Sequence, residues 1–328
     1  MNTLAVGIQS QGIVYDKYPL EGFEMMKRTG FSCCDFRLDS YLTGSSVGFP
    51  EENDFFQRSV GELKSFFAPH KEAAETAGIK IHQMCMPYPV CIPDTRDERS
   101  RYLIQTAAAK SMEICDFFQC PYMVVHGLDL AGICGEDVVV REWIDQFLEI
   151  LVPMAKELKI TICVENEYTN MGDHIMKDHC YDVKNAVAYI DHMNIKYGAE
   201  VFGFCFDTGK ANLAGINFED FIIQLGTRLK VLHIHDNDGT RDLHQMPFTF
   251  AGDCGKAYHT NWDGFVRGLQ KIQYDNVLSF DMASALLAFP GKMKQDVLRF
   301  VALMGSYFAG EIPGDKLGEK KGGTIRNR

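Results

Sequence analysis

The chain alternates short apolar segments with longer amphipathic ones, and this alternation constrains its fold more than any other feature. Eight segments rich in β-branched, aromatic and other apolar residues have the character of buried strands, at 4–8, 33–38, 79–86, 122–127, 160–165, 203–207, 231–236 and 277–282. Helical spacing is clearest over 98–118 and 137–158, and Pro153 is expected to kink the second helix. Eight repeats without a linker between them predict an α/β fold, a single (β/α)8 barrel with a parallel sheet.

An open, doubly wound sheet is the alternative architecture for 328 residues. A dinucleotide-binding fold of that kind carries G-x-G-x-x-G after its first strand, and no such motif follows residues 4–8. We therefore expect a barrel catalytic domain over 1–309. The polar segment 237–261 should form a loop over the barrel mouth, and the Gly- and Lys-rich tail 310–328 should be solvated or reach a neighbouring subunit.

The composition excludes several classes of protein. Hydrophobic residues make up 46% of the chain, which excludes disorder, and 33 basic against 44 acidic residues give a net charge of −11. Nucleic acids are therefore not expected as partners, because phosphate binding needs clustered positive charge. No apolar run is long enough for a membrane span, residues 1–9 do not resemble a signal peptide, and the 11 cysteines include no Cys-x-x-Cys pair. These features predict a cytoplasmic protein with reduced thiols and no membrane partner.

Polar residues close five consecutive predicted strands, at the end of a barrel where active sites are built: His126, Glu165, Asp207, His235 and Asp281. A single buried carboxylate is often an ion-pair partner or a helix N-cap, but several that converge with an imidazole favour a metal site. Glu165, Asp207, His235 and Asp281 are the predicted ligands, for Mn²⁺ first and otherwise Mg²⁺, Co²⁺ or Zn²⁺.

Alternation along a strand places His233 on the same interior face as His235 but deeper in the barrel. We interpret His233 as a hydrogen-bonded core residue or a support for the site rather than as a ligand. Glu167 shares the face of Glu165 and is either a second acid/base facing the substrate or a solvated residue. His244 and His259 lie in the long loop, where an exposed position is the simpler interpretation.

Four motifs also resemble those of the xylose isomerase-like TIM barrels, a superfamily that holds sugar isomerases and epimerases, inosose dehydratases and endonuclease IV. They are Val124-Val-His126-Gly, Val164-Glu165-Asn166, Cys205-Phe-Asp207-Thr-Gly-Lys210 and Leu232-His-Ile-His235-Asp-Asn-Asp-Gly-Thr-Arg241. The resemblance extends from about residue 4 to about 308. It implies that Glu165, Asp207, His235 and Asp281 bind a divalent metal, that Glu165 and Asp281 move the proton, and that Arg241 contacts the substrate.

The chain departs from the family pattern at four positions. Lys210 stands where the family has a histidine, Cys85 replaces a histidine after the third strand, Asp281 replaces a glutamate, and Met171 replaces a further glutamate of the ketose 3-epimerases. Lys210 is then a substrate-binding cation, a desolvated catalytic base or a salt-bridge partner. Cys85 is interpreted as a small buried filler, and Asp281 binds metal directly, through water or not at all. The missing histidines and the acidic charge count against endonuclease chemistry.

We therefore predict a metal-dependent sugar or cyclitol isomerase or epimerase that removes a proton beside a metal-polarised carbonyl. Glu165, Asp281 and Lys210 are the predicted catalytic residues, and His126, Glu167, His233 and Arg241 the predicted substrate contacts. One alternative is a lyase on the same scaffold, an inosose-type dehydratase or the catalytic subunit of a C-glycoside deglycosidase that acts on a 3-oxo-glycoside. A non-catalytic sugar-binding barrel is a third reading. The expected partners are a sugar or glycoside and further copies of the chain, with a small second subunit as an option.

Overall fold

Eight parallel strands form the inner ring of the protein. The computed structural model describes residues 4–42, 54–88, 102–126, 138–171, 174–177, 180–250 and 260–312. In chain order the ring strands are β1 (Val6–Gln9), β2 (Cys33–Arg37), β3 (Lys80–Cys85), β4 (Tyr122–Val125), β5 (Thr161–Glu165), β8 (Phe202–Asp207), β9 (Leu229–His233) and β10 (Leu278–Phe280). Every predicted strand segment overlaps one of them. The prediction of a (β/α)8 barrel is therefore confirmed.

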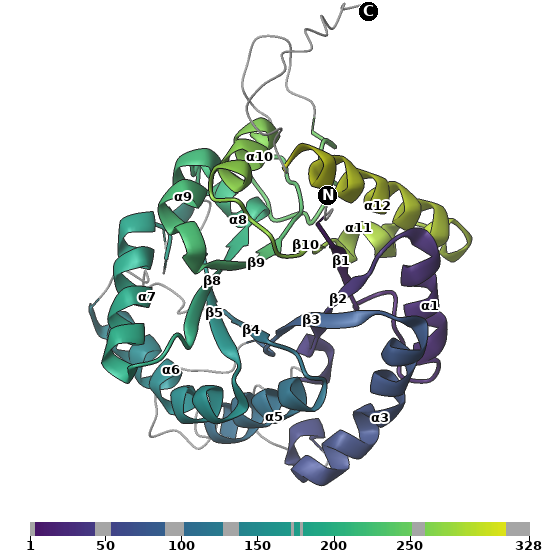
Figure 1. Ribbon diagram of the computed structural model, residues 1–328, viewed down its shortest axis with the longest axis horizontal. Helices are drawn as coiled ribbons and strands as arrows, with labels where there is room; N and C mark the ends of the chain where they lie inside the picture. Colours follow the sequence, from purple (N-terminus) through teal and green to yellow (C-terminus); the bar gives the residue numbers. More distant parts are fainter. Residues whose placement is uncertain are drawn as a thin grey trace, which may run out of the picture.

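The ring closes between its last two strands. The strand order is β10-β1-β2-β3-β4-β5-β8-β9, so β1 pairs with β2 on one side and with β10 on the other. A parallel bridge between Ile234 and Phe280 joins the two ends of this order, with the Ile234 N–H donating to the Ser279 carbonyl at 2.8 Å. Figure 1 shows the strands around a common axis with the helices outside them. Closure brings β2 and β10 to the same mouth although they lie far apart in the sequence.

The helices cover the outside of the ring. They are α1 (Pro19–Thr29), α3 (Val60–Ala77), α5 (Ala109–Phe117), α6 (Val138–Leu158), α7 (Val183–Tyr197), α8 (Thr208–Leu213), α9 (Phe218–Leu225), α10 (Trp262–Lys271), α11 (Ala283–Ala288) and α12 (Lys294–Glu311). Local sequence sets their ends. Ser59 and Glu62 form a capping box at the start of α3, and Gly78 ends that helix at φ 67°, a left-handed conformation that suits glycine.

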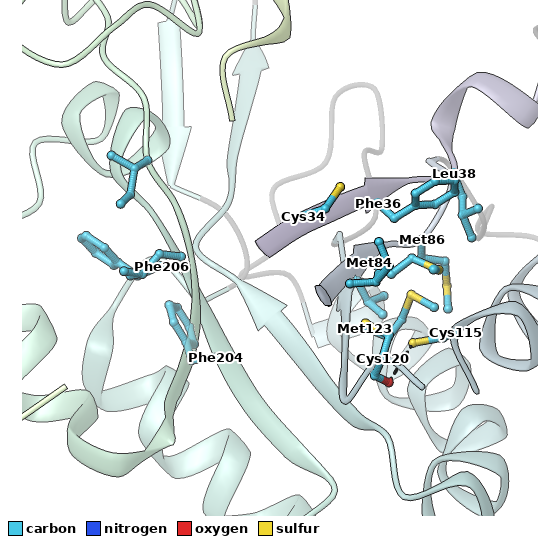
Figure 2. Close-up of a cluster of buried hydrophobic side chains, with 14 of the residues drawn as sticks. Cys34, Phe36, Leu38, Met84, Met86, Cys115, Cys120, Met123, Phe204 and Phe206 are labelled. Atoms are coloured by element: carbon cyan, nitrogen blue, oxygen red, sulfur yellow. Dashed lines mark hydrogen bonds between the residues drawn. The ribbon is translucent and has the colours of Figure 1, made fainter. Parts of the chain in front are cut away.

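Side chains alternate between the helix layer and the barrel interior. On β2 and β3, Phe36 and Met84 face the helices within the apolar layer that Figure 2 shows, in contact with residues of α5 and β4. A separate cluster of small apolar residues lies inside the ring: Cys85, Val124, Cys163, Cys205 and Val231. The polar residues of the site follow this interior layer at the C-terminal ends of the strands.

Several features differ in detail from the sequence-based expectations. A two-stranded antiparallel hairpin, β6 (Tyr168–Met171) and β7 (His174–Lys177), follows β5 and was not predicted. The predicted helix over 98–118 begins in the described residues with a wider π-helical stretch, Leu103–Ala108. The predicted helix over 137–158 corresponds to α6, which contains Pro153. The helix α12 ends two residues beyond the predicted boundary at 309, and residues 313–328 of the tail lie outside the described residues.

In the described part of the chain, no helix combines the length and the hydrophobicity that crossing a membrane requires.

The aromatic cluster between β2 and α3 yields a test of the packing. Phe67 is fully buried, with its ring 5.8 Å from Phe36 and 5.9 Å from Phe118. Phe67→Ala should lower the free energy of unfolding by about 3–5 kcal/mol, because it removes a buried ring and leaves a cavity. Urea denaturation followed by circular dichroism measures this change. Phe300→Ala, at a 54% exposed position on α12, is the control and should change stability by less than about 0.5 kcal/mol.

Candidate active site

The five residues predicted to close consecutive strands lie together at one mouth of the barrel. Glu165 and Asp207 are the last residues of β5 and β8, His126 and Asp281 directly follow β4 and β10, and His235 lies two residues after β9. Glu165, Asp207, His235 and Asp281 are all less than 5% exposed. Charged groups this deeply buried need partners, so the contacts of each group decide what the site can do.

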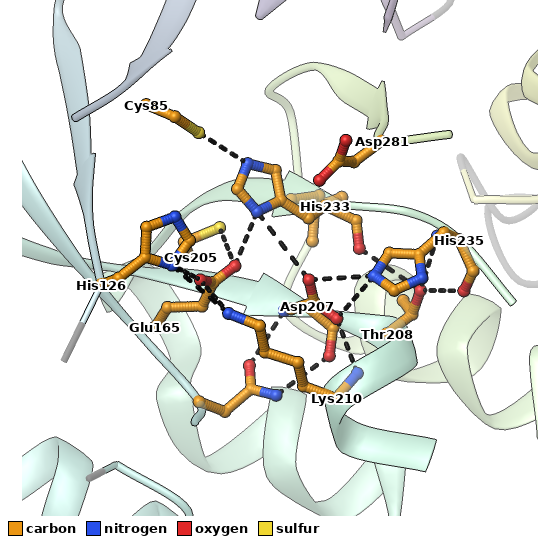
Figure 3. A network of polar contacts seen from close by, with 12 residues as sticks. Cys85, His126, Glu165, Cys205, Asp207, Thr208, Lys210, His233, His235 and Asp281 are labelled. Atoms are coloured by element: carbon orange, nitrogen blue, oxygen red, sulfur yellow. Dashed lines mark hydrogen bonds and ion pairs between the residues drawn. The ribbon is translucent and has the colours of Figure 1, made fainter. Parts of the chain in front are cut away.

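Glu165 is the centre of the polar network in Figure 3. Its Oε2 lies 2.6 Å from Lys210 Nζ and 3.0 Å from His126 Nδ1, and its Oε1 lies 2.6 Å from His233 Nδ1. Burial would raise the pKa of Glu165, but the positive charges of Lys210, His233 and His126 hold it well below the usual value. Glu165 is therefore a carboxylate at neutral pH.

Lys210 reaches Glu165 from the first turn of α8. Asp207 caps this helix by accepting the Lys210 backbone N–H at 2.7 Å, and the Lys210 side chain turns back across the mouth. Its Nζ contacts Glu167 Oε2 at 2.9 Å in addition to Glu165. Burial would lower the pKa of Lys210, but these two carboxylates raise it well above the usual value. Of the three readings of Lys210, the structure shows the salt-bridge partner, in the middle of the site.

Asp207 and His235 form a second pair. The His235 Nε2 lies 3.0 Å from the Asp207 carboxylate, and its backbone N–H donates to Thr208 Oγ1 at 2.9 Å. Gly209 is required beneath the ring, because a Cβ at this position would lie 1.9 Å from His235 Cε1. Asn166 ties the strands together: its amide donates to the Asp207 carbonyl at 3.0 Å and accepts the Asp207 N–H at 2.9 Å.

Asp281 is paired with an arginine that was not predicted. Arg37, at the end of β2, places Nη1 2.9 Å from Asp281 Oδ2 and also contacts Asp39. Burial would raise the pKa of Asp281, but Arg37 and nearby histidines lower it far below its ordinary value. The carboxylate of Asp281 is therefore ionised and engaged.

His244 joins the site from the long loop, although the sequence favoured an exposed position. Its ring stacks on that of His235 with centroids 3.9 Å apart and planes within 8°. Nδ1 lies 3.6 Å from Asp281 Oδ2, and Nε2 lies 3.4 Å from Asp242 Oδ1. Burial opposes protonation, but Asp281 and Asp242 raise the pKa of His244 to about 9. The Asp-x-His spacing in a polar loop is the signal that could have identified this pair.

His233 lies deeper than His235, as predicted, and connects two carboxylates. Its Nε2 is 3.1 Å from Asp35 Oδ2 and 3.4 Å from Cys85, while its Nδ1 faces Glu165. Asp35 and Arg37 were not predicted as site residues, but both occupy inward positions on a strand whose other residues are apolar. This alternation of polar and apolar residues could have identified them. Cys85 is fully buried, and its thiol touches the polar network.

Two other predicted residues have different surroundings. Glu167 is partly buried at the edge of the site and contacts both Lys210 and His126. Arg241 is 74% exposed and pairs with Asp238 at 3.2 Å in the same loop. The roles of both residues in substrate binding remain predictions.

The described residues include four groups of donors that could hold a metal ion. They are Asp35-Cys85-His233, Glu165-Cys205-His233, His235-Asp242-His244 and His126-Glu165-Glu167. None of these groups brings together three of the predicted ligands Glu165, Asp207, His235 and Asp281. In this arrangement Lys210 and His233 engage both oxygens of Glu165, and Arg37 engages Asp281. The predicted four-ligand site therefore does not fit the donor geometry of the structure.

Comparison with known proteins places the chain in a family. Residues 48–301 match the xylose isomerase-like TIM barrel family, and the chain belongs to it. A segment of 86 residues is 29% identical to the uncharacterized protein y4fM of Sinorhizobium fredii (strain NBRC 101917 / NGR234). That match spans 26% of this chain and 25% of the length of y4fM.

Solved structures share the whole fold. A D-tagatose 3-epimerase-like protein has a TM-score of 0.64 at 16% identity, covering 93% of this chain and 99% of its own. D-allulose 3-epimerase from Methylomonas sp. has a TM-score of 0.65 at 13% identity, and the match covers 95% of this chain and 98% of the epimerase. The 3-keto-D-glucoside 4-epimerase YcjR from E. coli has a TM-score of 0.62 at 15% identity, and the match covers 92% of this chain and 99% of YcjR. At these identities the likeness shows the fold alone.

The raised pKa of His244 predicts a pH-dependent contribution to stability. Because it rises from an ordinary value near 6.5 to about 9, the contribution is complete below pH 6.5 and is lost as the pH rises through 9. That difference corresponds to about 3 kcal/mol. The destabilisation caused by His244→Gln should therefore be larger at pH 6 than at pH 9.5 by up to that amount, measured by urea unfolding. An NMR titration of the His244 ring with a midpoint at or below 6.5 would contradict this prediction.

Proposed function

We propose that the protein is a sugar isomerase or epimerase that moves a proton at a carbon next to a carbonyl group. The observation that carries the proposal is the buried, ionised Glu165 at the end of β5, with the ammonium of Lys210 2.6 Å away. A carboxylate can remove the proton, and an adjacent cation can stabilise the negative charge that develops on the carbonyl oxygen. The fold shared with sugar epimerases supports the substrate class.

Binding of substrate would also change the basicity of Glu165. The salt bridge to Lys210 lowers the pKa of Glu165, which makes the carboxylate a weak base in the free protein. A carbonyl oxygen that accepts a hydrogen bond from Lys210 takes part of this positive charge. The basicity of Glu165 then rises at the moment when the proton has to be removed.

Asp281 is the second proposed proton carrier. It lies at the same mouth, after β10, in a salt bridge with Arg37. An epimerase needs groups on both faces of the reacting carbon, whereas an isomerase that moves a proton between neighbouring carbons can use Glu165 alone. The metal dependence and the preference for Mn²⁺ expected from the sequence are not part of this mechanism, because no three of the predicted ligands belong to one donor group among the described residues.

A lyase is the second candidate. The shared fold with a 3-keto-D-glucoside 4-epimerase favours oxidised glycosides among the substrates to test. Removal of the proton beside a 3-oxo group gives an enolate that can either be reprotonated or expel a substituent. We propose a cytoplasmic protein that acts on such small molecules as a homo-oligomer, and copurification of a small second subunit would support the lyase.

Solvent isotope exchange tests the proposal. In D2O the protein should incorporate deuterium beside the carbonyl of at least one member of a panel of ketohexoses and 3-oxo-glucosides, detected by NMR and mass spectrometry. Glu165→Gln should reduce the exchange rate at least about 100-fold, because the amide cannot accept the proton. Glu113→Gln is a matched control, since Glu113 pairs with Lys64 on the outer helices.

The outcomes separate the candidates. Exchange with epimerised or isomerised sugar supports the first function, and release of a substituent or formation of a double bond supports the lyase. Absence of exchange across the panel, with and without added divalent ions, would refute both and leave the non-catalytic sugar-binding protein.

A further inference from the structure

We propose that Lys210 takes the place that the family resemblance assigns to a divalent ion, so that the protein holds the reacting oxygen of its substrate with an ammonium group and requires no metal. The inference rests on the proposed function, which supplies the substrate class, a sugar with a carbonyl group. It deepens that proposal by naming the group that polarises the carbonyl. It comes from the disagreement between the predicted ligands and the contacts that they make.

The first step concerns the two oxygens of Glu165. Lys210 Nζ lies 2.6 Å from Oε2, and His233 Nδ1 lies 2.6 Å from Oε1. A transition metal would lie about 2.0–2.2 Å from a carboxylate oxygen and needs a free lone pair on it. Nitrogen donors approach both oxygens of Glu165. Lys210 Nζ and His126 Nδ1 both lie within hydrogen-bond distance of Oε2, at 2.6 and 3.0 Å, so an ion on this oxygen would have to displace one of them.

The second step concerns the other predicted ligands. Asp207 accepts the Lys210 backbone N–H through Oδ1 at 2.7 Å and faces His235 Nε2 at 3.0 Å. The contact to His235 has the length of a hydrogen bond, so Asp207 and His235 are paired with each other in this arrangement. Arg37 Nη1 forms a salt bridge with Asp281 Oδ2 at 2.9 Å. Each of the three carboxylates is thus paired with a side-chain nitrogen: Glu165 with Lys210, Asp207 with His235, and Asp281 with Arg37.

The third step is access to a substrate. The side chain of Lys210 is 11% exposed, and its neighbours Glu167 and His126 are 13% and 15% exposed, whereas Glu165 itself is sealed. Lys210 Nζ therefore lies at the boundary between the buried carboxylate and the barrel mouth. Its contact with His126 Nδ1, at 3.4 Å, is the longest it makes in this cluster. A substrate oxygen can replace that contact while the bonds to Glu165 and Glu167 remain.

The proton transfer balances with these groups alone. Glu165 accepts the proton from the carbon beside the carbonyl, and the C–H electron pair forms a carbon–carbon double bond. The carbonyl electron pair moves onto oxygen, where Lys210 donates a hydrogen bond or its proton. If the proton returns to the carbon that it left, the starting sugar forms again. If Lys210 has given its proton to the carbonyl oxygen, Glu165 can instead deliver its proton to the former carbonyl carbon, while the hydroxyl on the other carbon returns a proton to Lys210 and becomes the new carbonyl. No oxidant or reductant is needed.

Metal binding by the full-length chain is the direct test. Mn²⁺ added at up to about tenfold excess should remain free, as measured by its electron paramagnetic resonance signal, and metal analysis should find much less than one ion per chain. Deuterium exchange into the active sugar should persist after dialysis against a chelator. Stoichiometric Mn²⁺ binding that Glu165→Gln abolishes would overturn the proposal. A loss of exchange on chelation that Mn²⁺ restores would do the same.

Variants at position 210 test the replacement itself. Lys210→Met should slow exchange at least 100-fold, and Lys210→His, which supplies a metal ligand in place of the ammonium, should bind Mn²⁺ at least tenfold more tightly than the wild type. Wild-type exchange rates in Lys210→Met, or no gain in Mn²⁺ affinity in Lys210→His, would overturn the proposal if the variant remains folded by circular dichroism. Lys64→Met, which removes an ammonium paired with Glu113 on the outer helices, is the control and should change neither property.

The two proposals can fail separately. If no sugar exchanges deuterium with the wild type, the proposed function fails, while the Mn²⁺ titrations of the wild type and of the Lys210 variants still decide the role of Lys210. If exchange occurs but depends on a bound metal ion, the function stands and the inference about Lys210 is refuted.

Discussion

The buried salt bridge between Glu165 and Lys210 determines how the barrel mouth is organised. Neither charge has much contact with water, so each depends on the other and on hydrogen bonds to its remaining atoms. Removing one partner of such a pair typically costs about 3–5 kcal/mol, because the other charge stays buried. His126 and His233 complete the surroundings of Glu165, and Glu167 completes those of Lys210. The positions of these five side chains are therefore interdependent.

Only a closed barrel can assemble this network. Arg37 and Asp281 are separated by 244 residues, yet β2 and β10 both flank β1, which brings the two side chains together. Lys210 comes from α8, one turn beyond Asp207, and reaches across to β5. The apolar layer outside the ring and the small residues inside it hold the strands in place. The polar groups can then occupy the mouth without themselves providing the core.

The sequence identified the strand-end residues because a charged residue at the end of an apolar strand is conspicuous. Glu165, Asp207 and Asp281 were found in this way, and the alternation of β9 placed His233 deeper than His235. Partners were harder to predict. Arg37 and Asp281 meet only because the last strand, β10, pairs with the first, β1, and the position of His244 depends on the path of an irregular loop. The choice among three readings of Lys210 likewise required knowing which carboxylates its long side chain reaches.

The amide of Asn166 separates the alignment of the strands from the charges at the mouth. It bonds both backbone groups of Asp207, so the alignment of β5 and β8 at the mouth is fixed by neutral hydrogen bonds between side chain and backbone. The frame that carries Glu165 and Asp207 thus does not depend on the ammonium of Lys210 beside Glu165. A substitution at position 210 can therefore change the charge beside Glu165 while the strands keep their alignment. The chemistry of the mouth and the architecture of the barrel are in this way set by different residues.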